Sequence, residues 1–132
     1  MTSKSSHTVH VEERGFSSVQ AALTVVTVAH HDVAILTVSG SLDVLTAPQL
    51  TEAVSDVLAG TPRGLIIDLS TTEFLASAGM TALIAAHDAI APTALFGVIA
   101  DGPSTSRPLR LVGLDRTLTL YPTVDQALAA MT

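Results

Sequence analysis

Residues 33–69 read VAILTVSGSLDVLTAPQLTEAVSDVLAGTPRGLIIDL, and they carry the clearest structural pattern in the chain. The first seven, Val33–Ser39, are mostly apolar and β-branched, which is typical of a strand. A helix is predicted to begin at Thr46, whose hydroxyl can cap the N-terminus. The apolar positions of this helix recur at helical spacing and are Leu50, Val54, Val57 and Leu58. The short apolar run Leu65–Leu69 then predicts a buried strand, parallel to the first and joined to it by the helix.

The alternation of strands and helices continues on both sides of this stretch. Leu23–His30 is predicted to be a strand, joined to the next one in an antiparallel hairpin. Later helices are predicted from Ser77, at about Ser106–Val112 and from the capping-box pattern at Thr123, with strands at Leu95–Ala100 and Thr117–Tyr121. The predicted fold class is α/β: a four- to five-stranded mixed sheet, mostly parallel after the N-terminal hairpin, with helices packed on it.

The chain divides into one short arm and one domain. Residues 1–20 are polar, rich in serine, histidine and charge, and show no periodicity. We interpret them as a flexible N-terminal arm. Residues 21–132 show no second change in composition, so they are predicted to form a single domain.

The composition excludes several classes of function. Twelve acidic against six basic residues give a net charge of −6, the wrong sign for holding nucleic-acid phosphates. The chain has no cysteine, which rules out disulfides and thiolate metal sites. No apolar run reaches the roughly 18 residues needed to span a bilayer, and the N-terminus lacks a signal-peptide core. We therefore expect a cytoplasmic protein that binds neither nucleic acid nor membrane.

Four short motifs follow one another along the chain. They are GSLDVLTAPQL at Gly40–Leu50, IDLS at Ile67–Ser70, FLASAGM at Phe74–Met80 and LRLVGLDR at Leu109–Arg116. Each motif alone is weak, but their order and spacing resemble those of STAS domains, typified by the bacterial anti-anti-sigma factors. The resemblance covers residues 22–132, that is, the whole chain except the arm.

The resemblance implies a regulatory function without catalytic residues or a cofactor. In the family, the serine that opens the second helix is phosphorylated by an anti-sigma factor with a kinase fold. The unphosphorylated protein binds that factor, which frees a sigma factor, and phosphorylation abolishes the binding. By position, the switch residue is Ser77. The implied partner-binding residues are Asp43, Thr46, Ala76, Ser77, Ala78, Gly79 and Met80.

The expected position of Ser77 suits a switch of this kind. It is predicted to be a helix N-cap, with its hydroxyl near unpaired backbone N–H groups. A phosphate there adds about −1.5 to −2 charges, which a helix N-terminus can hold without unfolding. A partner surface fitted to a neutral hydroxyl would reject that charge.

Three residues depart from the family pattern. Ala76 stands where an acid commonly precedes the switch serine, Ala78 where serine or threonine often follows it, and Ser41 replaces a frequent acid. These departures leave a second hypothesis open: a STAS sensor or scaffold that is not phosphorylated. Such a domain would bind a nucleotide or small ligand, or assemble with other STAS domains. The oligomeric state is left open as well.

The same residues also have simpler structural interpretations. Ser77 can act only as an N-cap, Asp43 can satisfy backbone donors in a turn, and Asp68 is expected to cap local backbone. A hydrolase triad of Ser77 with His87 is excluded, because ten residues of helix separate them by about 15 Å.

No metal site is expected either. His30 and His31 are adjacent in an extended segment and should point to opposite sides. No carboxylate-histidine spacing of the helical zinc type occurs in the chain.

Overall fold

The computed structural model describes residues 22–131, so the arm expected at residues 1–20 lies outside the described residues. The described chain begins with a hairpin of β1 (Leu23–His30) and β2 (Val33–Leu42), in which His30 pairs with Val33. His31, in the two-residue turn, has a φ of 57°, and tight hairpin turns require such positive values. The predicted antiparallel hairpin is confirmed.

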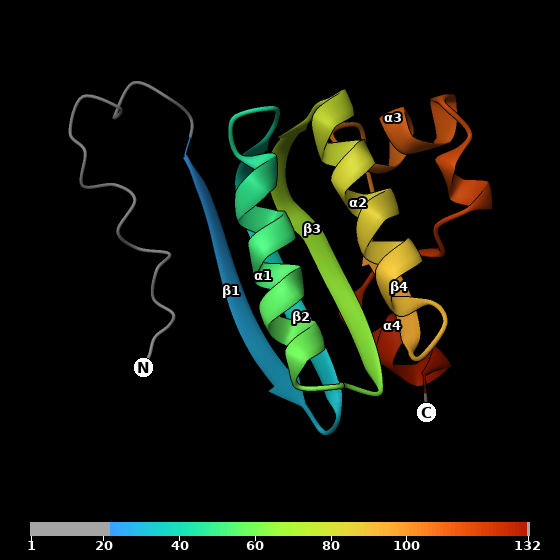
Figure 1. Ribbon diagram of the computed structural model, residues 1–132. Helices are drawn as coiled ribbons and strands as arrows, with labels where there is room; N and C mark the ends of the chain where they lie inside the picture. Colours follow the sequence, from blue (N-terminus) through green and yellow to red (C-terminus); the bar gives the residue numbers. More distant parts are fainter. Residues whose placement is uncertain (1–21, 132) are drawn as a thin grey trace.

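Helices and strands alternate after the hairpin, as Figure 1 shows. The elements are α1 (Ala47–Ala59), β3 (Gly64–Leu75), α2 (Ser77–Ile90), β4 (Leu95–Ile99), α3 (Ser106–Leu111), the 3₁₀ helix η3 (Leu114–Arg116), β5 (Leu120–Tyr121) and α4 (Val124–Ala130). The strands form one five-stranded sheet in the order β1-β2-β3-β4-β5. The β1–β2 pair is antiparallel and the other three pairs are parallel. The predicted α/β class and mixed sheet are confirmed.

Two apolar clusters lie on opposite faces of the sheet. Helices α1 and α2 lie side by side over one face (Figure 1) and contribute to the larger cluster together with Leu65 and Ile67 of β3. Helix α4 covers part of the other face, where Ala127 belongs to a cluster with Ile66 and Ile99. Successive residues of β3 thus enter different clusters, as expected of a central strand buried on both faces.

Two central strands are longer than predicted. β2 reaches Leu42 instead of ending at Ser39, and β3 reaches Leu75 instead of Leu69. The polar residues of the β3 extension stay in the strand because they pair with β2, and the Thr72 hydroxyl donates to a β2 carbonyl oxygen at 2.7 Å. Irregularities in the β2–β3 register, typical of β-bulges, accommodate this extension. Only Ala76 separates β3 from α2, so the start of α2 is joined directly to the sheet.

The C-terminal elements differ only slightly from the prediction. β5 is shorter than the predicted Thr117–Tyr121, because the N–H groups of residues 117 and 118 bond to the carbonyl oxygen of Leu114. The predicted cap of α4 is confirmed: Thr123 Oγ1 accepts a hydrogen bond from the N–H of Gln126 at 3.1 Å. Within residues 22–131, no helix is both long and apolar enough to cross a membrane.

Three segments that each follow a parallel strand lie at one end of the sheet. Because β2, β3 and β4 are parallel, their carboxyl ends lie at the same end of the sheet. The loop from β2 to α1, the start of α2 and helix α3 therefore lie at this end, which is the upper one in Figure 1.

Candidate functional site

The loop between β2 and α1 is held by its own side chains. Asp43 Oδ1 accepts hydrogen bonds from the backbone N–H groups of Leu45 at 3.0 Å and Thr46 at 3.1 Å. The Asp43 carbonyl oxygen also accepts from the N–H of Ala47 at 2.8 Å. This arrangement is an Asx-type turn. Asp43 therefore satisfies backbone donors and shapes the loop, which was one of its two expected roles.

Thr46 precedes α1 as predicted, but its hydroxyl does not cap the helix. Instead, Thr46 Oγ1 donates to the carbonyl oxygen of Ser41 at 2.7 Å and accepts from the N–H of Asp43 at 2.9 Å. The prediction of a threonine cap is thus wrong, because the Thr46 hydroxyl is already bonded to these two backbone groups. Thr46 ties the end of β2 to the loop.

Replacing Thr46 by valine should lower the free energy of unfolding by about 1–3 kcal/mol, because the Ser41 carbonyl and the Asp43 N–H lose their partner. Urea denaturation followed by circular dichroism measures this change. Thr51→Val is the matched control, since Thr51 is an exposed residue of α1, and it should change stability by less than about 0.5 kcal/mol. Equal stability of the two variants would contradict the bridging role of Thr46.

Ser77 is the first residue of α2 and is exposed. Its position at the start of the helix is confirmed, but the residue in the N-cap position is Ala76, with extended backbone angles of −93° and 173°. The Ser77 hydroxyl has no hydrogen-bond partner among residues 22–131. In the first turn of α2, the N–H groups of Gly79 and Met80 donate to the carbonyl oxygen of Ala76 at 2.9 Å and 3.1 Å, not to the Ser77 hydroxyl. The Ser77 side chain is thus available to a partner protein.

The loop and the start of α2 are joined through the end of β2. The N–H of Ala76 donates to the carbonyl oxygen of Leu42 at 2.9 Å. One turn into α2, Gly79 is buried so closely that a Cβ would lie 2.7 Å from Leu42 Cγ and 2.9 Å from Leu75 Cδ1. The end of β2, which leads into the Asp43 loop, is therefore closely packed against the start of α2.

The predicted partner-binding residues divide into two groups. Thr46 and Gly79 are buried, whereas Ala78 and Met80 are partly buried against the larger apolar cluster. These four residues therefore pack within the domain and support the exposed part of the site. Of the seven predicted residues, Ser77 alone is fully exposed, while Asp43 and Ala76 are partly so.

Exposed apolar side chains around Ser77 were missed by the sequence analysis. Val44 and Leu45, at the tip of the β2–α1 loop, are 73% and 75% exposed. At the end of β3, Phe74 is 55% exposed. Val44 and Leu45 are apolar, yet they lie in the predicted loop between Asp43 and Thr46. Exposed apolar side chains are typical of protein interfaces, so this pair could have indicated a contact surface.

The Asp68 carboxylate bonds to the local backbone. Asp68 is buried within β3, and its Oδ1 accepts from the N–H of Ser70 at 2.9 Å, as the expected backbone cap. It lies inside the strand rather than at its end, because β3 is longer than predicted. Within residues 22–131, no group of three or more His, Asp or Glu side chains is placed to hold a metal ion.

Comparison with known proteins identifies similar sequences and folds. The family model of the STAS domain matches residues 24–127. The anti-sigma-F factor antagonist RsfB of Mycobacterium tuberculosis is 42% identical over 110 residues, covering 83% of this chain and 90% of RsfB.

Solved structures of anti-sigma factor antagonists are also similar to this chain. The crystal structure of an anti-sigma factor antagonist from Mycobacterium paratuberculosis has a TM-score of 0.80 and 44% identity, and the match covers 83% of this chain and 94% of that one. The Bacillus cell fate determinant SpoIIAA, in its phosphorylated form, shares the fold with a TM-score of 0.62 at 15% identity, over 84% of this chain and 100% of that one.

Proposed function

The chain belongs to the STAS domain family, and we propose that it is an anti-sigma factor antagonist, which binds an anti-sigma factor and thereby releases a sigma factor. The observation that carries this proposal is the 42% identity to RsfB, an anti-sigma-F factor antagonist, over 83% of this chain. The function is regulatory binding, and no catalytic residue is assigned.

The proposed contact surface consists of the β2–α1 loop and the start of α2. Val44 and Leu45 supply exposed apolar area, and Ser77 supplies a hydroxyl without a partner in the described chain. The hydrogen bonds of Asp43 and Thr46 hold the loop in one conformation before binding. Preorganisation of this kind reduces the entropy lost on association.

We further propose that the anti-sigma factor has a kinase fold and phosphorylates Ser77. The Ser77 oxygen would attack the γ-phosphorus of ATP and lose its proton, while ADP leaves. The resulting dianion would stand at the first turn of α2, where the helix dipole favours negative charge. Because Ser77 is exposed and its hydroxyl makes no internal hydrogen bond in the described chain, phosphorylation would change the surface and leave the fold intact.

Mass spectrometry tests the proposal directly. The protein is incubated with ATP and each anti-sigma factor of the organism that encodes it, and complexes are isolated by size-exclusion chromatography before and after the reaction. We expect one anti-sigma factor to form a complex with the unmodified protein and to add one phosphate. Ser77→Ala should remove that phosphate, whereas Ser55→Ala, at an exposed serine of α1, should keep it.

Two outcomes would separate the parts of this proposal. If no anti-sigma factor forms a complex, the proposed function is wrong. If a complex forms but the phosphate is absent, or persists in Ser77→Ala, the antagonist function stands and the switch at Ser77 is wrong.

A further inference from the structure

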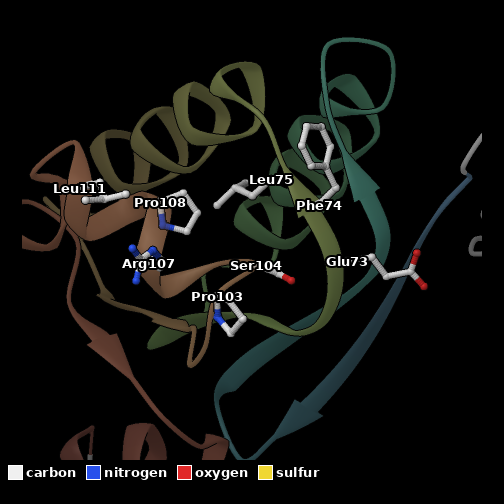
Figure 2. Close-up of a pocket in the computed structure, with 8 residues that line it drawn as sticks. All are labelled: Glu73, Phe74, Leu75, Pro103, Ser104, Arg107, Pro108 and Leu111. Atoms are coloured by element: carbon white, nitrogen blue, oxygen red, sulfur yellow. The ribbon is translucent and has the colours of Figure 1, made fainter.

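A groove runs along α3, beside the end of β3. It combines two adjoining hollows of about 410 Å³ and 500 Å³, which share Pro103, Arg107 and Leu111. Figure 2 shows Leu75 of β3 and Pro108 of α3 on one side of the first hollow and Arg107 on the other. We call this the α3 groove and define it by the residues that line the first hollow, which are Glu73, Phe74, Leu75, Pro103, Ser104, Arg107, Pro108 and Leu111.

Two apolar residues of the α3 groove, Leu111 and Phe74, are exposed. Helix α3 is anchored by Leu109, which is fully buried. Leu111, two residues later, is 74% exposed, and Phe74 at the other side of the groove is 55% exposed. Neither side chain contributes to the two apolar clusters of the described chain. Their exposure therefore marks a surface suited to a partner.

The lining of the two hollows contains charges of both signs: Arg107 and Arg110 are cationic, and Glu73 is anionic. The whole chain carries a net charge of −6. Of the four arginines in residues 22–131, three lie on α3 and η3: Arg107, Arg110 and Arg116. Arg110 forms an ion pair with Asp115 at 3.6 Å, whereas Arg107, in the groove, has no ion pair within the described residues. Glu73 and Arg107 line the same hollow without forming an ion pair, so the Arg107 guanidinium is free to bind a carboxylate of a partner.

We propose that the α3 groove binds a segment of the anti-sigma factor that combines an acidic side chain with an apolar one. The carboxylate pairs with the Arg107 guanidinium, whose planar fork matches it, and the apolar side chain covers Leu111. This inference rests on the proposed function and adds a second contact, separate from Ser77. A protein segment fits better than a small molecule, because small-molecule sites enclose most of their ligand and these side chains stand open.

Charge reversal tests the ionic part of the contact. Binding of the anti-sigma factor to the unphosphorylated protein is measured by isothermal titration calorimetry at fixed ionic strength. Arg107→Glu should weaken binding by at least about tenfold, since interfacial arginines are frequent hot spots. Arg116→Glu is the matched control: it makes the same charge change on η3, outside the groove, and should weaken binding by no more than about threefold through long-range electrostatics.

A second pair of variants tests the apolar part. Leu111→Ser should also weaken binding by about tenfold. Val28→Ser is the control, because Val28 is a half-exposed apolar residue of β1 outside the groove, and it should leave binding unchanged. Circular dichroism verifies that every variant is folded. A charge swap completes the test: one Asp→Arg or Glu→Arg change in the anti-sigma factor should restore its binding to Arg107→Glu.

Each outcome decides between the proposals. Equal weakening by Arg107→Glu and Arg116→Glu, or no weakening by either, would overturn the α3 groove contact and leave the antagonist function standing. Failure of the unmodified protein to bind any anti-sigma factor would overturn the proposed function, and the groove contact with it.

Discussion

Ser77→Asp should weaken binding to the anti-sigma factor by at least about a hundredfold, because a misplaced charge at an interface costs several kcal/mol. The substituted carboxylate sits at the first position of α2, where the helix dipole favours an anion. The fold should therefore be at least as stable as that of the unmodified protein. Loss of binding without loss of stability is the signature of a surface switch.

Calorimetric titration measures this effect, with thermal unfolding of the same samples beside it. Ser77→Ala should retain binding, since it stays neutral, and Ser55→Asp controls for the added charge at another exposed helical serine. Binding of Ser77→Asp within about threefold of the unmodified protein would mean that Ser77 lies outside the interface.

Gly79→Val should lower the free energy of unfolding by about 3 kcal/mol or more, because the site has no room for a side chain. A Cβ at residue 79 would lie 2.9 Å from the carbonyl oxygen of Leu42 and 2.9 Å from Leu75 Cδ1. The first of these atoms is backbone, so relief of the clash requires α2 to move away from the end of β2. The same movement would displace Ser77, and binding should fall together with stability.

Guanidinium denaturation measures the loss of stability. Ala85→Val is the matched control, because Ala85 is an exposed residue of the same helix and its substitution costs less than about 1 kcal/mol through helix propensity. A change in Gly79→Val no larger than that of the control would contradict the close packing of α2 on β2.

Most of the fold could be predicted because its signals are local. Val33–Ser39 and Leu65–Leu69 are continuous apolar runs, and the helix between them has its apolar residues at helical spacing. The extension of β3 to Leu75 could not be predicted in the same way. Its polar residues favour a loop, and they join the strand only because β2 supplies partners along its whole length.

The candidate site was predicted in position but not in detail. Sequence reasoning placed Ser77 at the start of a helix, and the structure agrees. Two of the three predicted caps failed, for different reasons. The Thr46 hydroxyl bonds to backbone groups at the end of β2 and in its own loop. The Ser77 hydroxyl is not a cap because the helix begins one residue earlier than expected, with Ala76 in the N-cap position. Thr123, which has no such competing partner, caps α4 as predicted.

The α3 groove was missed because its parts are distant in sequence. Phe74 belongs to β3 and Arg107 to α3, and β4 lies between them along the chain. Arg107, Arg110 and Arg116 lie within residues 107–116, but the sequence does not show that Arg107 lines a groove together with Phe74. Contacts of this kind follow from tertiary packing, which local patterns do not encode.

The strand order β1-β2-β3-β4-β5 is also the order in which the ribosome makes the strands. Each new strand pairs with the one completed just before it, so the sheet can grow along one edge during synthesis without waiting for later segments. The helices α1 and α2 are made in time to cover their face as it forms. Ile66 and Ile99, by contrast, stay open to solvent until α4, the last helix, has emerged.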